Sequence, residues 1–292
     1  MSGAAPAIPL VDVTSLRRDP VAGGSEAVGA IGRACRESGF FVVVGHGLDR
    51  SLASAFAQAE RFFTADPSVR EACAMVDDRG WAGRGSARAG DKELYDQSPG
   101  SEVRWPDLPG FRRALEAYEA DVLALAHDVL AGVARSLDLD AGFFAERMRS
   151  PECVLRLLDY PAQPATEAGE TTGAHTDYGV ITLLATDGEP GLEIRRGDGA
   201  WTAVDVPAGA YVVNLGDLLA RWTNDRYVST PHRVVSRTGA PRRSIPFFVN
   251  TDPDVVVSAV EPCVDDDRPA RHEPIRAGDF LRGRIDGTIP GP

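Results

Sequence analysis

The sequence predicts a mixed protein, mainly β with α, in which a helical N-terminal region packs on a C-terminal β-barrel or sandwich. Before residue 150, apolar residues recur mostly at helical spacing. After Pro151 the chain changes to short runs rich in β-branched and aromatic residues, separated by Gly, Pro and Asp. Such runs are typical of a sandwich or small barrel rather than of alternating β-α units. We therefore place a boundary near residue 150.

The N-terminal region is expected to contain two short strands and several helices. Residues 8–12 and 40–44 read as strands, the second closed by a turn at Gly45-His46-Gly47. Helical spacing predicts helices over 25–38, 51–63 and 111–137, with a short one at 143–148. Residues 77–109 are rich in Gly, Pro, Arg and Ser and predict a long loop, of the kind that often carries function.

The C-terminal region is expected to be a succession of short strands. The predicted runs are 154–158, 180–185, 192–195, 202–206, 210–215, 232–235, 244–249 and 254–259.

Composition narrows the classes of function. The 292-residue chain has a formal net charge of −12, which repels phosphate backbones and anionic membranes, so nucleic-acid and membrane partners are not expected. No window approaches a membrane span, and the first residues show no leader. The four cysteines form no C-x-x-C pair, which argues against a zinc site or disulfide framework. We expect a cytoplasmic enzyme of unknown oligomeric state.

A metal site is indicated by His175-Thr176-Asp177 at the head of an apolar strand. Side chains at i and i+2 share a face of a strand, so His175 and Asp177 can point into one cavity. His232, at the head of a later strand, is the best third ligand. Two histidines and one carboxylate are the ligands of non-haem iron(II) enzymes, which leave positions open for a co-substrate and oxygen. The H-E-x-x-H helix of zinc hydrolases is absent.

An anion site is indicated by Arg242-Arg243-Ser244, again at the head of an apolar strand. Arg242 and Ser244 share a face, so a guanidinium and a hydroxyl can hold a carboxylate inside the barrel. Tyr160 can add a third donor. A dicarboxylate whose other end chelates the metal fits this arrangement.

These pieces resemble the iron(II)/2-oxoglutarate-dependent dioxygenases of the isopenicillin-N-synthase-like family. The matching segments run in the family's order: Gly39-Phe40-Phe41, Gly45-His46-Gly47-Leu48, Lys92-Glu93, Trp105-Pro106, His175-Thr176-Asp177-Tyr178-Gly179, Thr182-Leu183-Leu184, Gly191-Leu192-Glu193, Val212-Val213-Asn214-Leu215-Gly216-Asp217, Thr230-Pro231-His232-Arg233-Val234 and Arg242-x-Ser244 with Pro246-Phe247-Phe248. The resemblance implies a double-stranded β-helix (jelly roll) over 151–255, an N-terminal helical region over 1–150 and a C-terminal extension over 256–292.

The resemblance also implies roles for residues. His175, Asp177 and His232 would bind Fe(II), while Arg242 and Ser244 would hold the distal carboxylate of 2-oxoglutarate, with Tyr160 donating to the same co-substrate. The family often has asparagine two residues before that tyrosine. Leu158 stands there in this chain, which departs from the usual polar wall.

The sequence gives weaker signals for residues that contact the substrate than for those that bind the metal and co-substrate. Arg79 in Arg79-Gly80-Trp81 has the form of a loop arginine that relatives place over a substrate carboxylate, although a solvated loop arginine is an equal alternative. Tyr178 and Arg156 are further candidates. We expect Asn214 to bond the backbone within the barrel, and Asp217 to serve a turn or cap. His46 and His127 are expected to be structural, and His272 solvated.

The implied activity is hydroxylation, desaturation or cyclisation of a small molecule by O2, with release of succinate and CO2, in bacterial secondary metabolism. One alternative is a non-haem iron oxidase of the same fold that does not use 2-oxoglutarate. A jelly roll that only binds a small acid is a second. A nucleic-acid demethylase fits the negative charge poorly.

Overall fold

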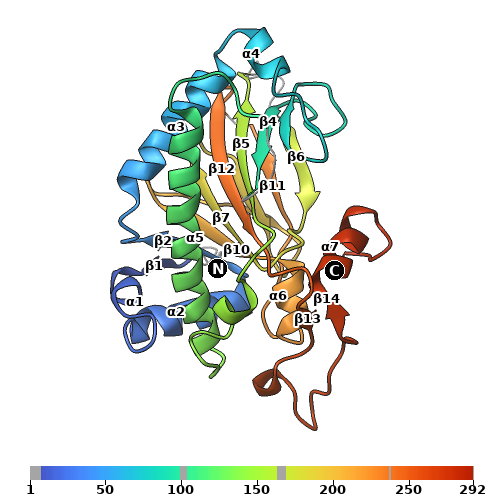
Figure 1. Ribbon diagram of the computed structural model, residues 1–292. Coiled ribbons are helices and arrows are strands. Elements are labelled where there is room, and N and C mark those ends of the chain that lie inside the picture. The colour runs from blue at the N-terminus through green and yellow to red at the C-terminus, as the bar shows by residue number, and fades with distance from the viewer. Residues whose placement is uncertain (1–7, 99–103, 163–168, 237, 292) are drawn as a thin grey trace, which may run out of the picture.

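Two facing sheets form the centre of the protein, as the computed structural model of residues 8–98, 104–162, 169–236 and 238–291 shows (Figure 1). Within these ranges the larger sheet has eight strands, in the order β1 (Leu10–Asp12), β2 (Phe40–Val44), β10 (Tyr211–Leu215), β7 (Ile181–Thr186), β12 (Arg242–Val249), β5 (Val154–Tyr160), β4 (Glu93–Gln97) and β3 (Gly80–Ala82). The smaller sheet has four strands, in the order β6 (Glu170–His175), β11 (His232–Val235), β8 (Leu192–Arg195) and β9 (Trp201–Ala203).

Helices cover the outer face of the larger sheet. The long ones are α2 (Ser25–Glu37), α3 (Asp49–Phe63) and α5 (Phe111–Arg135), and α3 and α5 lie in front of the sheet in Figure 1. The shorter helices are α1 (Thr14–Arg18), α4 (Pro67–Glu71), α6 (Asp217–Trp222) and α7 (Ala277–Ile285), with 3₁₀ turns at Ala145–Arg147 and Glu261–Cys263. No helix in the described ranges has both the length and the apolar character that crossing a membrane requires.

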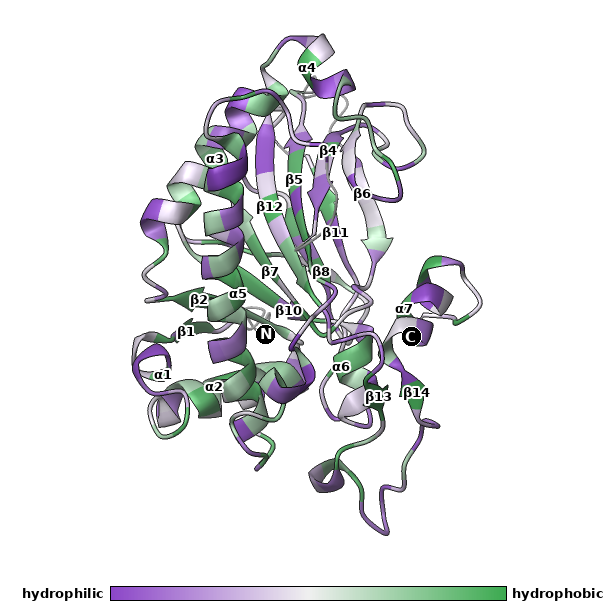
Figure 2. Ribbon diagram, in the orientation of Figure 1, coloured by the Kyte–Doolittle hydropathy of each residue, from purple (hydrophilic) through white to green (hydrophobic). Residues whose placement is uncertain are grey.

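Alternation along the strands separates the core from the jelly-roll interior. In β12, Ile245, Phe247 and Val249 are fully buried in the core that α5 also joins, and Arg242 and Ser244 face the smaller sheet. In Figure 2, β7 and β10 are mostly hydrophobic, whereas β12 is hydrophilic near the top of the view. Burying each large apolar side chain of this core contributes about 1.5–3 kcal/mol.

The jelly-roll prediction is confirmed, and the three long predicted helices are present. The predicted loop over 77–109 is wrong in one respect, because it contains β3 and β4, which pair with each other and extend the large sheet beyond β5. Their sequences carry too few apolar residues to mark them, so β4 forms by pairing with β5, and β3 by pairing with β4. The N-terminal region therefore supplies strands as well as helices.

Two strands and one residue also differ from the expectation. β6 is polar and largely exposed, and it forms by pairing with β11. The strand predicted over 254–259 is reduced to β13 (Val256–Val257), which pairs with β14 (Ile275–Arg276). Asp217, expected in a turn or cap, is the first residue of α6 and makes no capping hydrogen bond.

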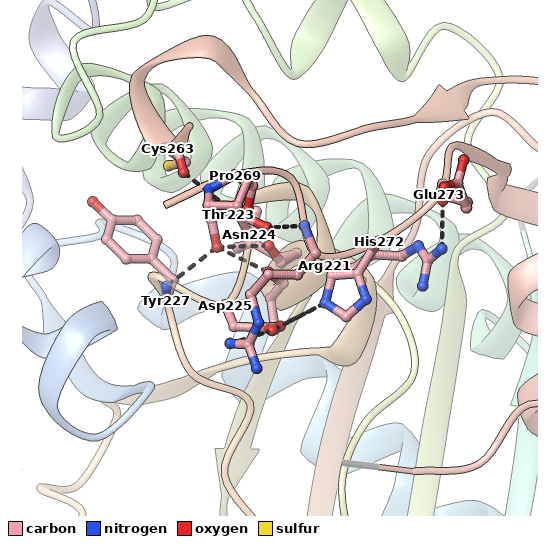
Figure 3. Close-up of polar contacts among 12 residues, drawn as sticks. Arg221, Thr223, Asn224, Asp225, Tyr227, Cys263, Pro269, His272 and Glu273 are labelled. Atoms are coloured by element: carbon pink, nitrogen blue, oxygen red, sulfur yellow. Dashed lines mark hydrogen bonds and ion pairs between the residues drawn. The ribbon is translucent and has the colours of Figure 1, made fainter. Parts of the chain in front are cut away.

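The C-terminal segment is held against the end of α6 by polar contacts (Figure 3). Asn224 and Asp225 both have left-handed backbone conformations, with φ of 52° and 57°. The Asn224 amide donates to the carbonyls of Cys263 and Pro269, and the Asp225 carboxylate lies 3.0 Å from Nε2 of His272. His272 is thus paired rather than solvated. These contacts fix the segment that leads into α7.

Candidate metal and co-substrate site

The three predicted metal ligands meet at one end of the smaller sheet, where β6 ends and β11 begins. His175 ends β6 and His232 begins β11, and the two residues lie directly opposite each other in the antiparallel pairing. Asp177 follows two residues after His175, in the loop that leads to β7. Their ligand atoms all lie within 4.8 Å of one another.

The geometry leaves one free atom on each of the three side chains. Oδ1 of Asp177 lies 3.8 Å from Nε2 of His175 and 3.9 Å from Nε2 of His232. These separations are too long for hydrogen bonds and suit three atoms that share one ion. Among the described residues, Oδ1 of Asp177 accepts no hydrogen bond. The arrangement can hold a divalent ion of the type that two histidines and one carboxylate select.

Neighbouring groups orient these side chains. Oδ2 of Asp177 accepts hydrogen bonds of 2.6 Å from both Thr182 and Asn214. Nδ1 of His175 lies 2.8 Å from the carbonyl of Gly173, and Nδ1 of His232 lies 3.3 Å from that of Thr230. These contacts fix Oδ1 and the two Nε2 atoms as the available ligands. The expectation that the Asn214 side chain bonds the backbone is wrong, because its amide donates to the Asp177 carboxylate.

The protonation states of the ligands also favour metal binding. Burial alone would raise the pKa of the Asp177 carboxyl, but the adjacent imidazoles and the two hydrogen bonds outweigh it and lower the pKa. Burial lowers the pKa of His232. A charged carboxylate and a neutral imidazole are the forms that bind a metal ion.

A buried arginine lies deeper in the same interior. Arg242 is 5% exposed, and its guanidinium donates to Ser244 Oγ at 3.2 Å and to the carbonyl of Glu189 at 3.3 Å. Tyr160 lies in register with Arg242 on β5, with its ring 5.2 Å from the guanidinium carbon. Among the described residues no carboxylate pairs with Arg242. A buried cation without a counter-ion calls for a bound anion, and a carboxylate fits the guanidinium and hydroxyl.

Both groups open onto one cavity of about 460 Å³ between the two sheets. Its lining includes all six residues predicted for metal and co-substrate, together with Tyr178 and Arg156. Leu158, two residues before Tyr160 on β5, gives the cavity an apolar side chain at that position. The cavity can hold a chelating dicarboxylate and a second small molecule beside it.

Arg79 is placed differently. It is not among the described residues that line the cavity, and its guanidinium donates to the backbone carbonyl of Asp78. Its neighbour Trp81 donates to Glu93. A role for Arg79 at the substrate stays a prediction that the cavity lining does not support.

A buried ion pair from the C-terminal helix α7 supports the loop of residues 176–180, which contains Asp177 and is called the metal loop below. Sequence reasoning did not find this pair. Arg284 of α7 lies 2.7 Å from Oδ2 of Asp217, and both side chains are less than a tenth exposed. The same Asp217 oxygen accepts a hydrogen bond from the hydroxyl of Thr176, the residue between His175 and Asp177. Arg284 also lies over the Tyr178 ring, 4.6 Å from its centroid. No local pattern marks a partner so distant in sequence.

Family comparisons agree with this geometry. The family model of the 2OG-Fe(II) oxygenase superfamily matches residues 151–251. A second family model, described as "non-haem dioxygenase in morphine synthesis N-terminal", matches residues 8–110. The 2-oxoglutarate-Fe(II) type oxidoreductase hxnY of Emericella nidulans is 32% identical over 94% of this chain and 88% of its own length. The chain belongs to the 2OG-Fe(II) oxygenase superfamily. It is a member of the isopenicillin-N-synthase-like family.

Solved structures of oxygenases share the fold. A full-length Neurospora crassa protein in complex with alpha-KG superposes with a TM-score of 0.88 at 27% identity, over 97% of this chain and 96% of that one. A putative 2OG-Fe(II) oxygenase family protein from Caulobacter crescentus gives 0.86 at 30% identity, over 97% and 100%. The chain is thus a 2-oxoglutarate-dependent dioxygenase that uses Fe(II). This favours the dioxygenase over the oxidase and the binding module considered from sequence.

Proposed function

We propose that this dioxygenase hydroxylates, desaturates or cyclises a small molecule in bacterial secondary metabolism, with release of succinate and CO2. The observation that carries the proposal is one cavity lined by a two-histidine, one-carboxylate cluster and by a buried arginine to which no carboxylate of the described residues is bound. The bacterial setting rests on the abundance of alanine, glycine and arginine. The net charge of −12 argues against a nucleic-acid substrate.

In this proposal His175, Asp177 and His232 hold Fe(II) through Nε2, Oδ1 and Nε2. Their neighbours keep the three atoms in position before the metal arrives, which lowers the cost of binding. The bound ion would supply oxygen activation coupled to oxidation of the co-substrate.

The co-substrate's distal carboxylate binds Arg242 and Ser244, and Tyr160 donates to the same molecule. The guanidinium lies deep between the sheets, so the other end of 2-oxoglutarate points towards the three metal ligands. Apolar residues such as Leu158 exclude water from the space beside it, which protects the reacting centre from side reactions.

The substrate enters the remaining part of the cavity, where Tyr178 and Arg156 are the proposed contacts. Tyr178 is at the entrance, 37% exposed, and Arg284 orients its ring. Arg156 lies on β5 and is fixed by Asp96 through two hydrogen bonds of 2.6 and 2.7 Å. We retain the three segments 1–150, 151–255 and 256–292 as a proposed organisation of the enzyme.

The proposal is tested by replacing one of the three metal ligands, and a histidine outside the cavity serves as the control. We expect His232→Ala to abolish Fe(II) binding under anaerobic conditions and succinate formation from 2-oxoglutarate. His272→Ala, which removes a histidine outside the cavity, should retain both. Tight Fe(II) binding by the His232→Ala protein, with undiminished succinate formation, would refute the assignment.

A further inference from the structure

Lys92 is the only lysine of the chain, and it lines the cavity. It lies immediately before β4, and its ammonium is 5.8 Å from the centroid of the Tyr160 ring. Among the described residues its side chain has no ion pair and no hydrogen bond. Burial, together with the adjacent charge of Arg156, lowers its pKa. A half-buried ammonium that faces an aromatic ring, with no carboxylate bound to it among the described residues, costs free energy that a bound anion would recover.

Lys92 is separate from the position proposed for 2-oxoglutarate. Arg242 on β12 lies opposite Tyr160 on β5, and Glu93 on β4 lies opposite Asp159. Lys92 is therefore level with Tyr160, but on the far side of it from Arg242. Since neighbouring strands are about 4.8 Å apart, the two cations are carried by backbones about 10 Å apart. Their charged ends face the same ring, with the Arg242 guanidinium carbon 5.2 Å and the Lys92 ammonium 5.8 Å from the Tyr160 centroid. Arg242 and Ser244 hold the distal carboxylate of 2-oxoglutarate in the proposed function, so the Lys92 ammonium is available to a second anion beside it.

The charges of the cavity leave an excess of cations. Four arginine or lysine side chains line it, whereas Asp177 is the only lining carboxylate among the described residues. Fe(II) and doubly charged 2-oxoglutarate balance each other, and Arg242 balances Asp177. What remains is the group of Arg88, Lys92 and Arg156.

One acidic group balances part of this excess. Asp96 is fully buried, binds Arg156 through both oxygens and lies 3.7 Å from Arg88. Asp78 also approaches Arg88 at 3.8 Å, but both side chains are substantially exposed, so solvent screens that pair. On its cavity side, the wall around β4 and β5 therefore carries more cations than carboxylates, and Lys92 is the member to which no carboxylate of the described residues is bound.

Next to these cations the lining is apolar. Leu94 on β4, Leu158 on β5 and Phe248 on β12 face the same space. We propose that the substrate is a small carboxylic acid whose carboxylate binds Lys92 and whose apolar body packs on these three side chains. This inference rests on the proposed function, because it concerns the part of the cavity that the metal and co-substrate leave free.

A neutral analogue would leave the ammonium unpaired. A site that pairs a buried polar group with the substrate discriminates strongly against a molecule that lacks the matching group. We therefore expect the carboxylic acid to bind at least about tenfold more tightly than its primary amide, which corresponds to about 1.4 kcal/mol.

The single lysine allows a direct measurement. Protein grown with [ε-13C]lysine gives one lysine resonance, from Lys92, and Zn(II) with 2-oxoglutarate provides a diamagnetic, inactive complex. The probes are a panel of arylacetic and alkylacetic acids, beginning with phenylacetate, each paired with its primary amide. We expect acids to shift the Lys92 resonance and the amides to leave it unchanged. The spectrum of the Zn(II) and 2-oxoglutarate complex before any acid is added serves as the reference. A resonance that responds to no acid of the panel, or that moves as far with the amides as with the acids, would overturn the proposal.

Activity of the iron-loaded enzyme gives the second measurement. We expect the acids that shift the resonance to stimulate succinate formation, and Lys92→Met to raise the KM for those acids at least about tenfold. The KM for 2-oxoglutarate should stay at the wild-type value in the same variant. Arg84→Met, which removes an exposed cation of the same loop outside the cavity lining, is the control.

Two results overturn the inference and leave the proposed function intact. One is stimulation of succinate formation by amides and acids alike. The other is an unchanged KM for the acids in the Lys92→Met protein. Failure of the function itself looks different, because succinate formation would then be missing from the wild-type enzyme even though Fe(II) and 2-oxoglutarate are supplied.

Discussion

The two faces of the larger sheet use the same strands for different purposes. On the face covered by helices, β12 presents Ile245, Phe247 and Val249, all fully buried in the apolar core. On the opposite face the same strand presents Arg242 and Ser244 to the cavity. The helix-covered face is held by packing, and the cavity face is held by polar contacts that leave selected atoms free.

Side chains one residue apart on the same strand therefore belong to the stabilising core and to the proposed site. A change on the helix-covered face is expected to lower the free energy of unfolding without altering affinity for the co-substrate. A change on the cavity face is expected to do the reverse. Four variants test how complete the separation is.

The largest effect is expected for Phe247→Ala. Removing a fully buried phenylalanine leaves a cavity in the core and costs about 3–5 kcal/mol of unfolding free energy. Denaturant unfolding of the metal-free protein measures it. The fraction that remains folded should keep the wild-type KM for 2-oxoglutarate. A large rise in that KM would show that the two faces are coupled.

Arg284→Gln should come next, since it leaves Asp217 buried without its counter-ion. Breaking a buried ion pair by removing one partner costs about 3 kcal/mol. Because the pair also supports Thr176 and Tyr178, iron affinity should fall in the same variant. The control on the same helix is Arg282→Gln, whose pair with Asp279 is exposed and contributes less than about 1 kcal/mol. Equal unfolding curves for the two variants would contradict the importance of the buried pair.

Asn214→Ala tests the cavity face alone. Its amide donates to Oδ2 of Asp177, so its loss should lower Fe(II) affinity by about 10- to 100-fold. Anaerobic Fe(II) titration measures the effect, and Asn250→Ala, on a residue outside the cavity lining, serves as the control. Unchanged Fe(II) affinity would mean that Thr182 alone orients the carboxylate.

The smallest effect is expected for Glu119→Gln, in a polar pair on the helix-covered side. Burial raises the pKa of Glu119, which accepts a hydrogen bond from Gln97. A folded pKa above the unfolded one stabilises the protein at pH values below the unfolded pKa, and this stabilisation is lost as pH rises through the folded value. The Gln variant should therefore lose that pH dependence. Unfolding measured from mildly acidic to neutral pH checks it, and parallel profiles would exclude Glu119 as the source.

The sequence was most informative where residue type and spacing both carry chemistry. His175, Asp177 and His232 were assigned as ligands because an i, i+2 pair at a strand head shares a face, and because the family pattern supplies the third residue. The structure brings their ligand atoms within 4.8 Å. The jelly roll is predicted by the succession of short β-branched and aromatic runs after Pro151, together with the resemblance to the family.

Other features depend on pairing across the fold, which local sequence does not encode. β6 has a polar sequence and forms only against β11. Lys92 occupies the cavity because β4 pairs with the edge of β5, a pairing that the polar sequence of this segment does not indicate. Arg284 meets Asp217 across 67 residues of chain. In each case the partner, rather than the residue itself, determines the position.

The pairing of α7 with the metal loop has a consequence for biosynthesis. Thr176 and Arg284 are 108 residues apart, so the ribosome must make that whole stretch before the loop gains its last buried contact. Stable iron loading is accordingly expected only once α7 has been synthesised and has folded against this loop.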